Sequence, residues 1–206
     1  MTFPDRPFAS IADYFDAYSD RLARAAASVS RPALAKAQAL LGETLARDGQ
    51  VWACGNGGSA AIANHLVCDH AKGVAADTNL RPRVHSLSAT VEMITAIAND
   101  ISYAEVFAEQ LRLMGRPADL LITISSSGDS DNIVRAIEQA RSIGMATIAL
   151  SGFSGGRSAA MADVSLHVDA DNYGIVEDLH QSLMHVLAQY VRQYHMPAAL
   201  VGARKF

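Results

Sequence analysis

Cysteine is scarce in this sequence, which has two among 206 residues, Cys54 and Cys68. They do not form a Cys-x-x-Cys pair, and two cysteines so placed argue against a disulfide framework. Each is expected to be a small buried side chain rather than a nucleophile. Long apolar runs are also lacking, since none approaches the ~20 residues of a membrane-spanning helix. No basic start leads into an apolar stretch, as a secretory signal would. We therefore expect a soluble, cytoplasmic protein that does not enter a membrane.

Charge is low as well. Lys, Arg, Asp and Glu make up 18% of the residues, and the formal net charge is −4 at pH 7. Without a long basic run, this composition argues against nucleic acid as the main ligand, although a local basic patch stays open. Half of the residues are apolar, which argues against disorder. At this length the chain fits one large domain with a sizeable core better than two small ones.

What the sequence does contain is a regular order of predicted elements. Residues 1–48 are expected to form a helical hairpin, because apolar side chains recur at helical spacing on both sides of a break at Ser30–Pro32. From residue 49 to 195, short apolar strands alternate with helices. The strands are predicted at Gln50–Cys54, Arg83–Leu87, Leu120–Ser125, Met145–Leu150 and Val164–Val168. The helices are predicted at Ala60–Lys72, Val91–Ala98, Ala104–Met114, Ser130–Ile143 and Ile175–Tyr194.

This alternation predicts an α/β fold, namely a doubly wound, five-stranded, mostly parallel sheet flanked by helices, with the N-terminal hairpin as part of the same domain. Residues 196–206 are expected to form a loose tail. In such sheets, ligands bind beyond the carboxyl ends of the strands. Two turns rich in glycine and serine follow predicted strands at that edge, which makes them the first candidates for a binding site.

The first turn is Cys54-Gly55-Asn56-Gly57-Gly58-Ser59. Its glycines let the backbone pass close to a ligand, and Ser59 can cap the following helix. Free N–H groups and the positive end of the helix dipole would then face one anion. The turn lacks the third glycine and the downstream acid of a dinucleotide fingerprint, and it lacks the Gly-Lys-Ser of a nucleotide P-loop. By itself it fits an ordinary tight turn equally well.

The second turn is Ser125-Ser126-Ser127-Gly128-Asp129-Ser130. Four serine hydroxyls surround the start of a predicted helix here. Serine hydroxyls and backbone N–H groups are the neutral donors that a phosphate needs. Six consecutive small polar residues are uncommon in a merely structural loop. Together the two turns indicate a phosphorylated small molecule as the ligand.

Two predicted helices carry acids and imidazoles at helical spacing. His65 and Asp69 stand at i and i+4 just after the first turn, and Glu177, Gln181 and His185 stand at i, i+4 and i+8 on the last helix. Two helices that each present an acid and an imidazole could build a general acid–base pair or a metal site. A lone histidine on a helix is more often a core or surface residue, so the indication rests on the set.

Several of these stretches together resemble the SIS (sugar isomerase) domain proteins of the phosphoheptose isomerase type. The resemblance runs from the N-terminal helices to about Tyr194. It is carried by CGNGGS at 54–59, AND at 98–100, ISSSGDS at 124–130, LSGFSGG at 150–156 and IVEDLH at 175–180. It implies an aldose–ketose isomerase that converts sedoheptulose 7-phosphate into heptose 7-phosphate through an enediol. It also implies a homotetramer with sites shared between subunits, for which the apolar faces of the N-terminal helices are suited. Those faces suit an intramolecular core equally well.

The same resemblance assigns roles to residues. Asp69 would be the base and His185 its acid–base partner. His65, Asp69, Glu177 and His185 could hold one zinc ion per subunit, as in some relatives. Substrate contacts are expected from Asn56, Gly57, Gly58, Ser59, Asn99, Asp100, Ser125, Ser126, Ser127, Ser130 and Glu177. Asp100 fits a helix cap nearly as well.

Two positions depart from the family pattern. Asp69 stands where the family has a glutamate, which is one methylene longer, and Glu177 stands where the family has a glutamine. Both changes suit a His–Asp–Glu–His metal site at least as well as metal-free proton transfer. They leave two alternatives open. One is a non-catalytic sugar-phosphate-binding or regulatory SIS protein, like the relative that binds the bacterial replication initiator, and the other is an isomerase of another phosphosugar.

Overall fold

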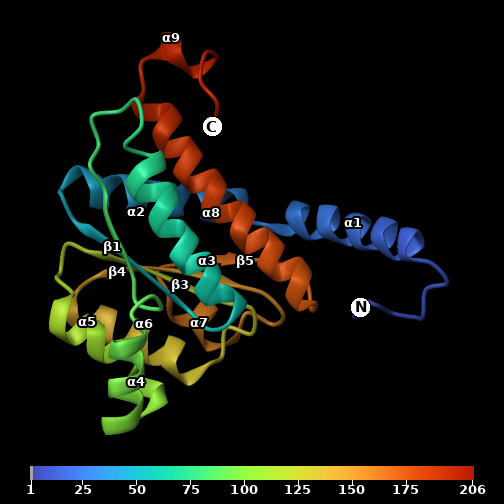
Figure 1. Cartoon of the computed structure of the whole chain (residues 1–206), viewed down its shortest axis with the longest axis horizontal. Helices are drawn as coiled ribbons and strands as arrows, with labels where there is room; N and C mark the ends of the chain where they lie inside the picture. The colour runs from blue at the N-terminus through green and yellow to red at the C-terminus, as the bar shows by residue number, and fades with distance from the viewer. Residues whose placement is uncertain (1) are drawn as a thin grey trace.

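A computed structural model describes residues 2–206 and shows helices packed on both faces of one sheet (Figure 1). The sheet has five parallel strands in the order β2-β1-β3-β4-β5. Their bounds are β1 (Gln50–Gly55), β2 (Arg83–Ser86), β3 (Leu120–Ser125), β4 (Ala146–Ser151) and β5 (Val164–His167). The predicted sheet is confirmed, and each strand end lies within one residue of its expected place. The strand order reverses between β1 and β3, so the turns that follow these two strands are neighbours at the carboxyl edge.

The helices account for most of the remaining chain. Their bounds are α1 (Ile11–Ser28), α2 (Arg31–Ala46), α3 (Gly58–Val67), α4 (Val91–Asp100), α5 (Ala108–Met114), α6 (Asp131–Ile143), α7 (Gly156–Met161), α8 (Tyr173–His195) and α9 (Ala198–Val201). A π-helix, η1 (Cys68–Gly73), follows α3, and a 3-10 turn, η2 (Tyr103–Glu105), precedes α5. Within residues 2–206, no helix has the length and apolar character needed to cross a membrane.

The side chains of β1 show how the sheet builds a core on each face. Val51 and Ala53 point into the cluster formed with α2, α3 and α8, whereas Trp52 and Cys54 point into the cluster formed with α5 and α6. This period of two is what a strand covered on both faces requires. Burial raises the pKa of the Cys54 thiol, so Cys54 is the inert core residue that was expected. For Cys68 the expectation of burial was wrong, since its side chain is exposed on η1.

The two N-terminal helices are confirmed, but they do not fold back on each other as a hairpin. Helix α1 packs along α8 and projects from the body, whereas α2 packs against the sheet (Figure 1). Ser10 and Ser30 cap the two helices by accepting hydrogen bonds from backbone N–H groups three residues on. The Tyr18 hydroxyl on α1 donates a hydrogen bond of 2.5 Å to Asp178 on α8. Burial and this carboxylate raise the pKa of Tyr18.

Two other expectations about helices were wrong in ways that matter for the site. The helix predicted over Ala60–Lys72 is α-helical only to Val67, after which the wider π-helix carries Asp69. The stretch after Met196, expected as a loose tail, forms α9 and returns toward α8 (Figure 1). The short helix α7 was not predicted, because six residues that begin with glycine show little periodicity.

Candidate active site

The turn between β1 and α3 approaches its surroundings so closely that its glycines are required. Gly57 has φ +55 and ψ −122, a conformation that side chains disfavour. A Cβ on Gly55 would stand 2.5 Å from the carbonyl oxygen of Ser59. Ser59 does not cap α3 as expected, because it is the second residue of the helix and is buried, while Gly57 takes the capping position without a side-chain bond. The first N–H groups of α3 therefore receive no hydrogen bond acceptor from a capping side chain.

Glu177 lies directly over this turn. A Cβ on Gly58 would stand 2.4 Å from Glu177 Oε2 and 2.7 Å from its Oε1, so the carboxylate occupies the space that glycine leaves. A carboxylate at the N-terminus of α3 is favoured by the helix dipole. This contact brings α8 and the β1–α3 turn together. The two segments lie far apart in the sequence, so the contact could not be predicted from it.

The serine turn after β3 is held by its own hydrogen bonds and by the neighbouring glycine stretch. The N–H of Gly128 donates to both the carbonyl and the hydroxyl oxygen of Ser125, each at 3.1 Å. Gly128, with φ +66, lies so close to the backbone of Gly155 that a Cβ would collide with it. Arg157 on α7 holds the Asp129 carboxylate at the rim of the turn. The turn is thus fixed before any ligand arrives.

Several hydroxyls of the turn stay available. The buried Ser126 Oγ makes no hydrogen bond within residues 2–206. Ser130 is the first residue before α6, yet its side chain makes no capping bond. Buried polar groups without a hydrogen-bond partner are uncommon. A phosphate oxygen bound at this turn could accept a hydrogen bond from the Ser126 hydroxyl.

A pair of amides joins the two turns. Asn56 Nδ2 donates to Asn132 Oδ1, and Asn132 Nδ2 donates back to Asn56 Oδ1, both at 2.9 Å. The Tyr103 hydroxyl donates a third bond of 2.9 Å to Asn56 Oδ1. Asn56 was expected to contact substrate, but its amide is engaged in holding the turns in register. Asn132 and Tyr103 were not identified from the sequence, because their partner lies far away along the chain.

Three of the four residues predicted as an acid–base or metal set come together. His65 Nε2 lies 3.3 Å from Asp69 Oδ1, and His185 Nε2 lies 3.4 Å from Asp69 Oδ2. The two Nε2 atoms are 3.4 Å apart, and the imidazole rings meet edge to face. One carboxylate on the π-helix is therefore flanked by two imidazoles. All three side chains are at least partly exposed, so a solute can reach them.

The donor atoms of the three residues lie close enough together to share one metal ion. Zn²⁺ with bonds of about 2.0–2.1 Å to nitrogen and oxygen has ligand atoms about 3.3–3.4 Å apart. The two Nε2 atoms are 3.4 Å apart, but they lie 3.3 and 3.4 Å from different oxygens of Asp69, so the carboxylate would turn to place one oxygen on a shared ion. Three protein ligands with an open fourth position are typical of catalytic zinc. The Gln181 amide nitrogen lies 2.8 Å from His185 Nε2, so metal binding would replace this hydrogen bond.

Glu177 does not join this cluster. It precedes His185 by eight residues on α8, about 12 Å along a helix axis, and its carboxylate lies at Gly58 instead. Asn99 and Asp100 lie in the last turn of α4. The Asn99 side-chain amide donates a hydrogen bond of 2.8 Å to the Asp100 carboxylate. Asp100 caps no helix, contrary to the alternative left open for it.

Two further histidines lie in the core rather than at the site. Burial lowers the pKa of His70 and of His180 to about 4, so both are neutral near pH 7. His180 lies on a different side of α8 from His185, as the helical spacing predicts.

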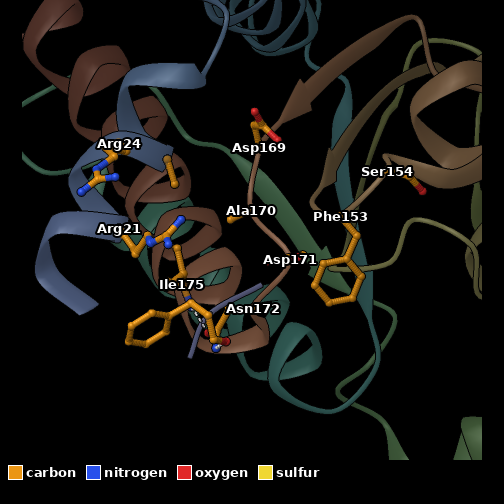
Figure 2. Close-up of a pocket in the computed structure, with 11 residues that line it drawn as sticks. Arg21, Arg24, Phe153, Ser154, Asp169, Ala170, Asp171, Asn172 and Ile175 are labelled. Atoms are coloured by element: carbon orange, nitrogen blue, oxygen red, sulfur yellow. Dashed lines mark hydrogen bonds between the residues drawn. The ribbon is translucent and has the colours of Figure 1, made fainter. Parts of the chain in front are cut away.

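A polar cavity of about 570 Å³ lies elsewhere, between α1 and the turns after β4 and β5. Figure 2 shows Arg21 and Arg24 on α1, facing the segment from Asp169 to Asn172 that leads into α8. None of the residues predicted to form the site lines this cavity. The positive charges of its two arginines are balanced by the negative charges of two aspartates, so its walls carry no net charge. We therefore keep the turns and the histidine cluster as the candidate active site.

Comparison with known proteins identifies the family of this chain. The family model described as SIS domain matches residues 13–152. The chain belongs to the SIS domain family. It also belongs with the phosphoheptose isomerases: it is 39% identical to the one from Desulfovibrio desulfuricans, over 73% of this chain and 71% of that protein. The one from Helicobacter pylori strain P12 is 37% identical over 75% of this chain and 80% of that protein.

Solved structures of the family have the same fold. The phosphoheptose isomerase from Francisella tularensis superposes with a TM-score of 0.82 at 32% identity, covering 89% of this chain and 96% of that one. The one from Neisseria gonorrhoeae gives 0.81 at 31% identity, covering 88% and 98%. The resemblance stated from the sequence is thus confirmed, together with the SIS fold.

Proposed function

We propose that this protein is an aldose–ketose isomerase that converts sedoheptulose 7-phosphate into heptose 7-phosphate. The observation that carries the proposal is the Asp69 carboxylate flanked by the imidazoles of His65 and His185. His65 lies on α3, the helix that the β1–α3 turn begins, Asp69 lies on η1, which continues it, and His185 lies on α8. The names of the relatives in the SIS family support the substrate.

In the proposed reaction the two turns bind the substrate, and Asp69 and His185 transfer its protons. The serine turn, with Ser125, Ser126, Ser127 and Ser130, and the N–H groups of Gly57, Gly58 and Ser59 would hold the phosphate and hydroxyls. Asp69 would take a proton from C1 of the ketose and return it to C2 of the enediol. While its Nε2 is free of metal, His185 would carry the hydroxyl proton from one oxygen to the other. Glu177, Asn99 and Asp100 are proposed to contact the sugar hydroxyls.

We further propose that the three-residue cluster holds one Zn²⁺ per subunit, with His65, Asp69 and His185 as ligands. The donor set supports this, since imidazole nitrogen and carboxylate oxygen both suit zinc. When bound, the ion supplies positive charge that polarises the carbonyl oxygen of the sugar. The shorter Asp69 is compatible with this role, because its oxygens already reach both imidazoles.

A direct assay tests the proposal. Purified protein, with Zn²⁺ added or removed, is incubated with sedoheptulose 7-phosphate, and heptose 7-phosphate is measured by chromatography. Asp69→Asn and His185→Gln should each lower kcat about 10²- to 10⁴-fold. His195→Gln, at an exposed histidine outside the cluster, is the control. Binding of the sugar phosphate without turnover in either condition would contradict the isomerase and favour a binding protein. Turnover of a different phosphosugar alone would replace the substrate.

The homotetramer expected from the family is also a proposal. Helix α1 projects from the body and leaves Ile11 and Phe15 exposed by 83% and 65% (Figure 1). Large apolar side chains one turn apart on a projecting helix support burial against another copy. Light scattering after size exclusion tests it, and Phe15→Glu should yield smaller species. The cytoplasmic location stays a prediction.

A further inference from the structure

The segment after α8 folds back along the helix instead of leaving it. The chain turns at α9 and its last residues return beside the end of α8 (Figure 1). The return is fixed by Arg192 on α8, whose side chain is only 12% exposed. Arg192 Nη1 donates a bond of 3.0 Å to the carbonyl oxygen of Lys205, and its guanidinium lies 4.7 Å from the centre of the Phe206 ring. One arginine thus holds the backbone and the ring of the returning segment.

The same arginine also holds the segment that follows the π-helix. Arg192 Nε donates to the carbonyl oxygen of Ala76 at 3.2 Å, and Nη2 donates to the Asp77 carboxylate at 3.0 Å. Arg204, in the returning segment, lies 3.4 Å from the same carboxylate. We call Arg192, Asp77, Arg204 and Phe206 the C-terminal clamp. It ties three segments together: α8, the chain after Asp69, and residues 197–206.

The clamp stands at the candidate active site. A cavity of about 260 Å³ is lined by His65, Asp69 and His185 at one end and by Arg192 and Phe206 at the other. No residue of the serine turn lines it. In the proposed reaction the phosphate lies at the turns and the cluster acts at C1 and C2. The cavity therefore lies beyond the carbonyl end of the sugar, opposite the phosphate.

We propose that Phe206, held by Arg192, is a specificity-determining residue that forms the wall facing the carbonyl end of the sugar. This inference rests on the proposed function and adds to it a segment outside the strands and turns of the fold. An aromatic wall contacts the substrate equally in the ground state and the transition state, so its loss raises KM and leaves kcat nearly unchanged. The wall also limits access of solvent to the cluster.

Two measurements test the proposal. Phe206→Ala should raise KM for sedoheptulose 7-phosphate about tenfold, as expected for loss of a large apolar contact, and change kcat less than threefold. In the absence of substrate, diethyl pyrocarbonate should modify His65 and His185 about threefold faster in Phe206→Ala than in the wild type. Peptide mass mapping assigns each histidine, with exposed His195 as the internal reference.

Two further variants separate the wall from folding. Asp77→Asn keeps the side-chain size at a residue with φ +59, which asparagine tolerates. It should release the clamp and raise both KM and the rate of histidine modification about threefold. Tyr194→Ala removes an exposed aromatic ring of α8 that does not line the cavity, and should change neither. Equal KM values and equal modification rates in Phe206→Ala and Tyr194→Ala would overturn the proposal. If the wild type has no turnover, the proposed function fails, and the modification rates decide whether the segment covers the cluster.

Discussion

Asn56 and Asn132 face each other with their side-chain amides in a double hydrogen bond, each bond 2.9 Å long. Asn56 belongs to the turn after β1, and Asn132 is the second residue of α6, which the serine turn begins. Asn132 is 2% exposed, so its amide depends on this partner. The pair therefore sets the distance between the two turns that are proposed to share one substrate.

Replacement of Asn132 by aspartate tests this pair. Asn132→Asp removes both N–H donors and places a carboxylate against the Asn56 oxygen in a buried position. The free energy of unfolding should fall by about 1–3 kcal/mol, as measured by urea titration. Asn64→Asp is the matched control, because exposed Asn64 only accepts a hydrogen bond, of 2.6 Å from Ser86, and aspartate accepts it too. An equal loss in both variants would contradict the role of the pair.

Two glycines of the first turn should respond differently to alanine. At Gly58 the new methyl group meets the flexible end of Glu177, so Gly58→Ala should displace the carboxylate and raise KM about tenfold, while the free energy of unfolding changes by less than about 1 kcal/mol. At Gly55 it meets the backbone of Ser59, so Gly55→Ala should cost more than about 2 kcal/mol.

A double variant checks the cause. If Gly58→Ala acts by moving Glu177, then its effect on KM should vanish in the Glu177→Ala background. Gly42→Ala, within α2 and with its nearest neighbour at 3.6 Å, serves as the control: it should leave KM unchanged and raise the free energy of unfolding by about 0.5–1 kcal/mol. Additive effects of the Gly58 and Glu177 changes would show that the carboxylate is not the group displaced.

The sheet could be predicted because its signal is local. Leu120–Ser125 is a continuous run of buried residues that ends in a polar turn, and its predicted bounds match β3. The end of α3 could not be predicted, since η1 keeps helical composition and differs only in its hydrogen bonds, such as that from Val74 to Asp69. A π-helix is stabilised by its surroundings, and here Arg192 and Asp77 lie just beyond it.

The candidate site was predictable to the extent that its residues share a helix face or a turn. His65 and Asp69 are four residues apart, and the serine turn is contiguous, so spacing marked them as candidates and the family resemblance selected them. Glu177 shared a face with His185 as well, yet its carboxylate went to Gly58, because glycine left space there. Asn132, Tyr103 and Phe206 reach the site through contacts that span the chain, and no local periodicity marks them.

Stability should fall as the pH falls, because His70 and His180 are buried and neutral. Burial holds each pKa at about 4, below the ordinary 6.5. Between these values the unfolded chain binds more protons than the folded one, so stability is complete above about pH 6.5 and is lost as the pH drops toward 4. From pH 7 to pH 5 the loss should be of the order of 2 kcal/mol per histidine.

Urea titrations at the two pH values check this expectation. His180→Gln removes one titrating group, so the difference in unfolding free energy between pH 7 and pH 5 should shrink by about 2 kcal/mol. The same pH dependence in His180→Gln and the wild type would mean that this histidine is not held neutral.

Gln181 should oppose metal binding. Its amide lies 2.8 Å from His185 Nε2, the atom that would have to bind Zn²⁺, and the amide nitrogen donates to the lone pair that the metal needs. A neutral hydrogen bond contributes about 0.5–1.5 kcal/mol net, so Gln181→Ala should raise the affinity for Zn²⁺ about two- to tenfold. Competition with a chromophoric chelator measures this change. Gln193→Ala, at an exposed glutamine farther along α8 that does not line the cavity, should leave the affinity unchanged. Weaker binding in Gln181→Ala alone would instead make the amide a support of the metal site, with its oxygen turned toward the ion.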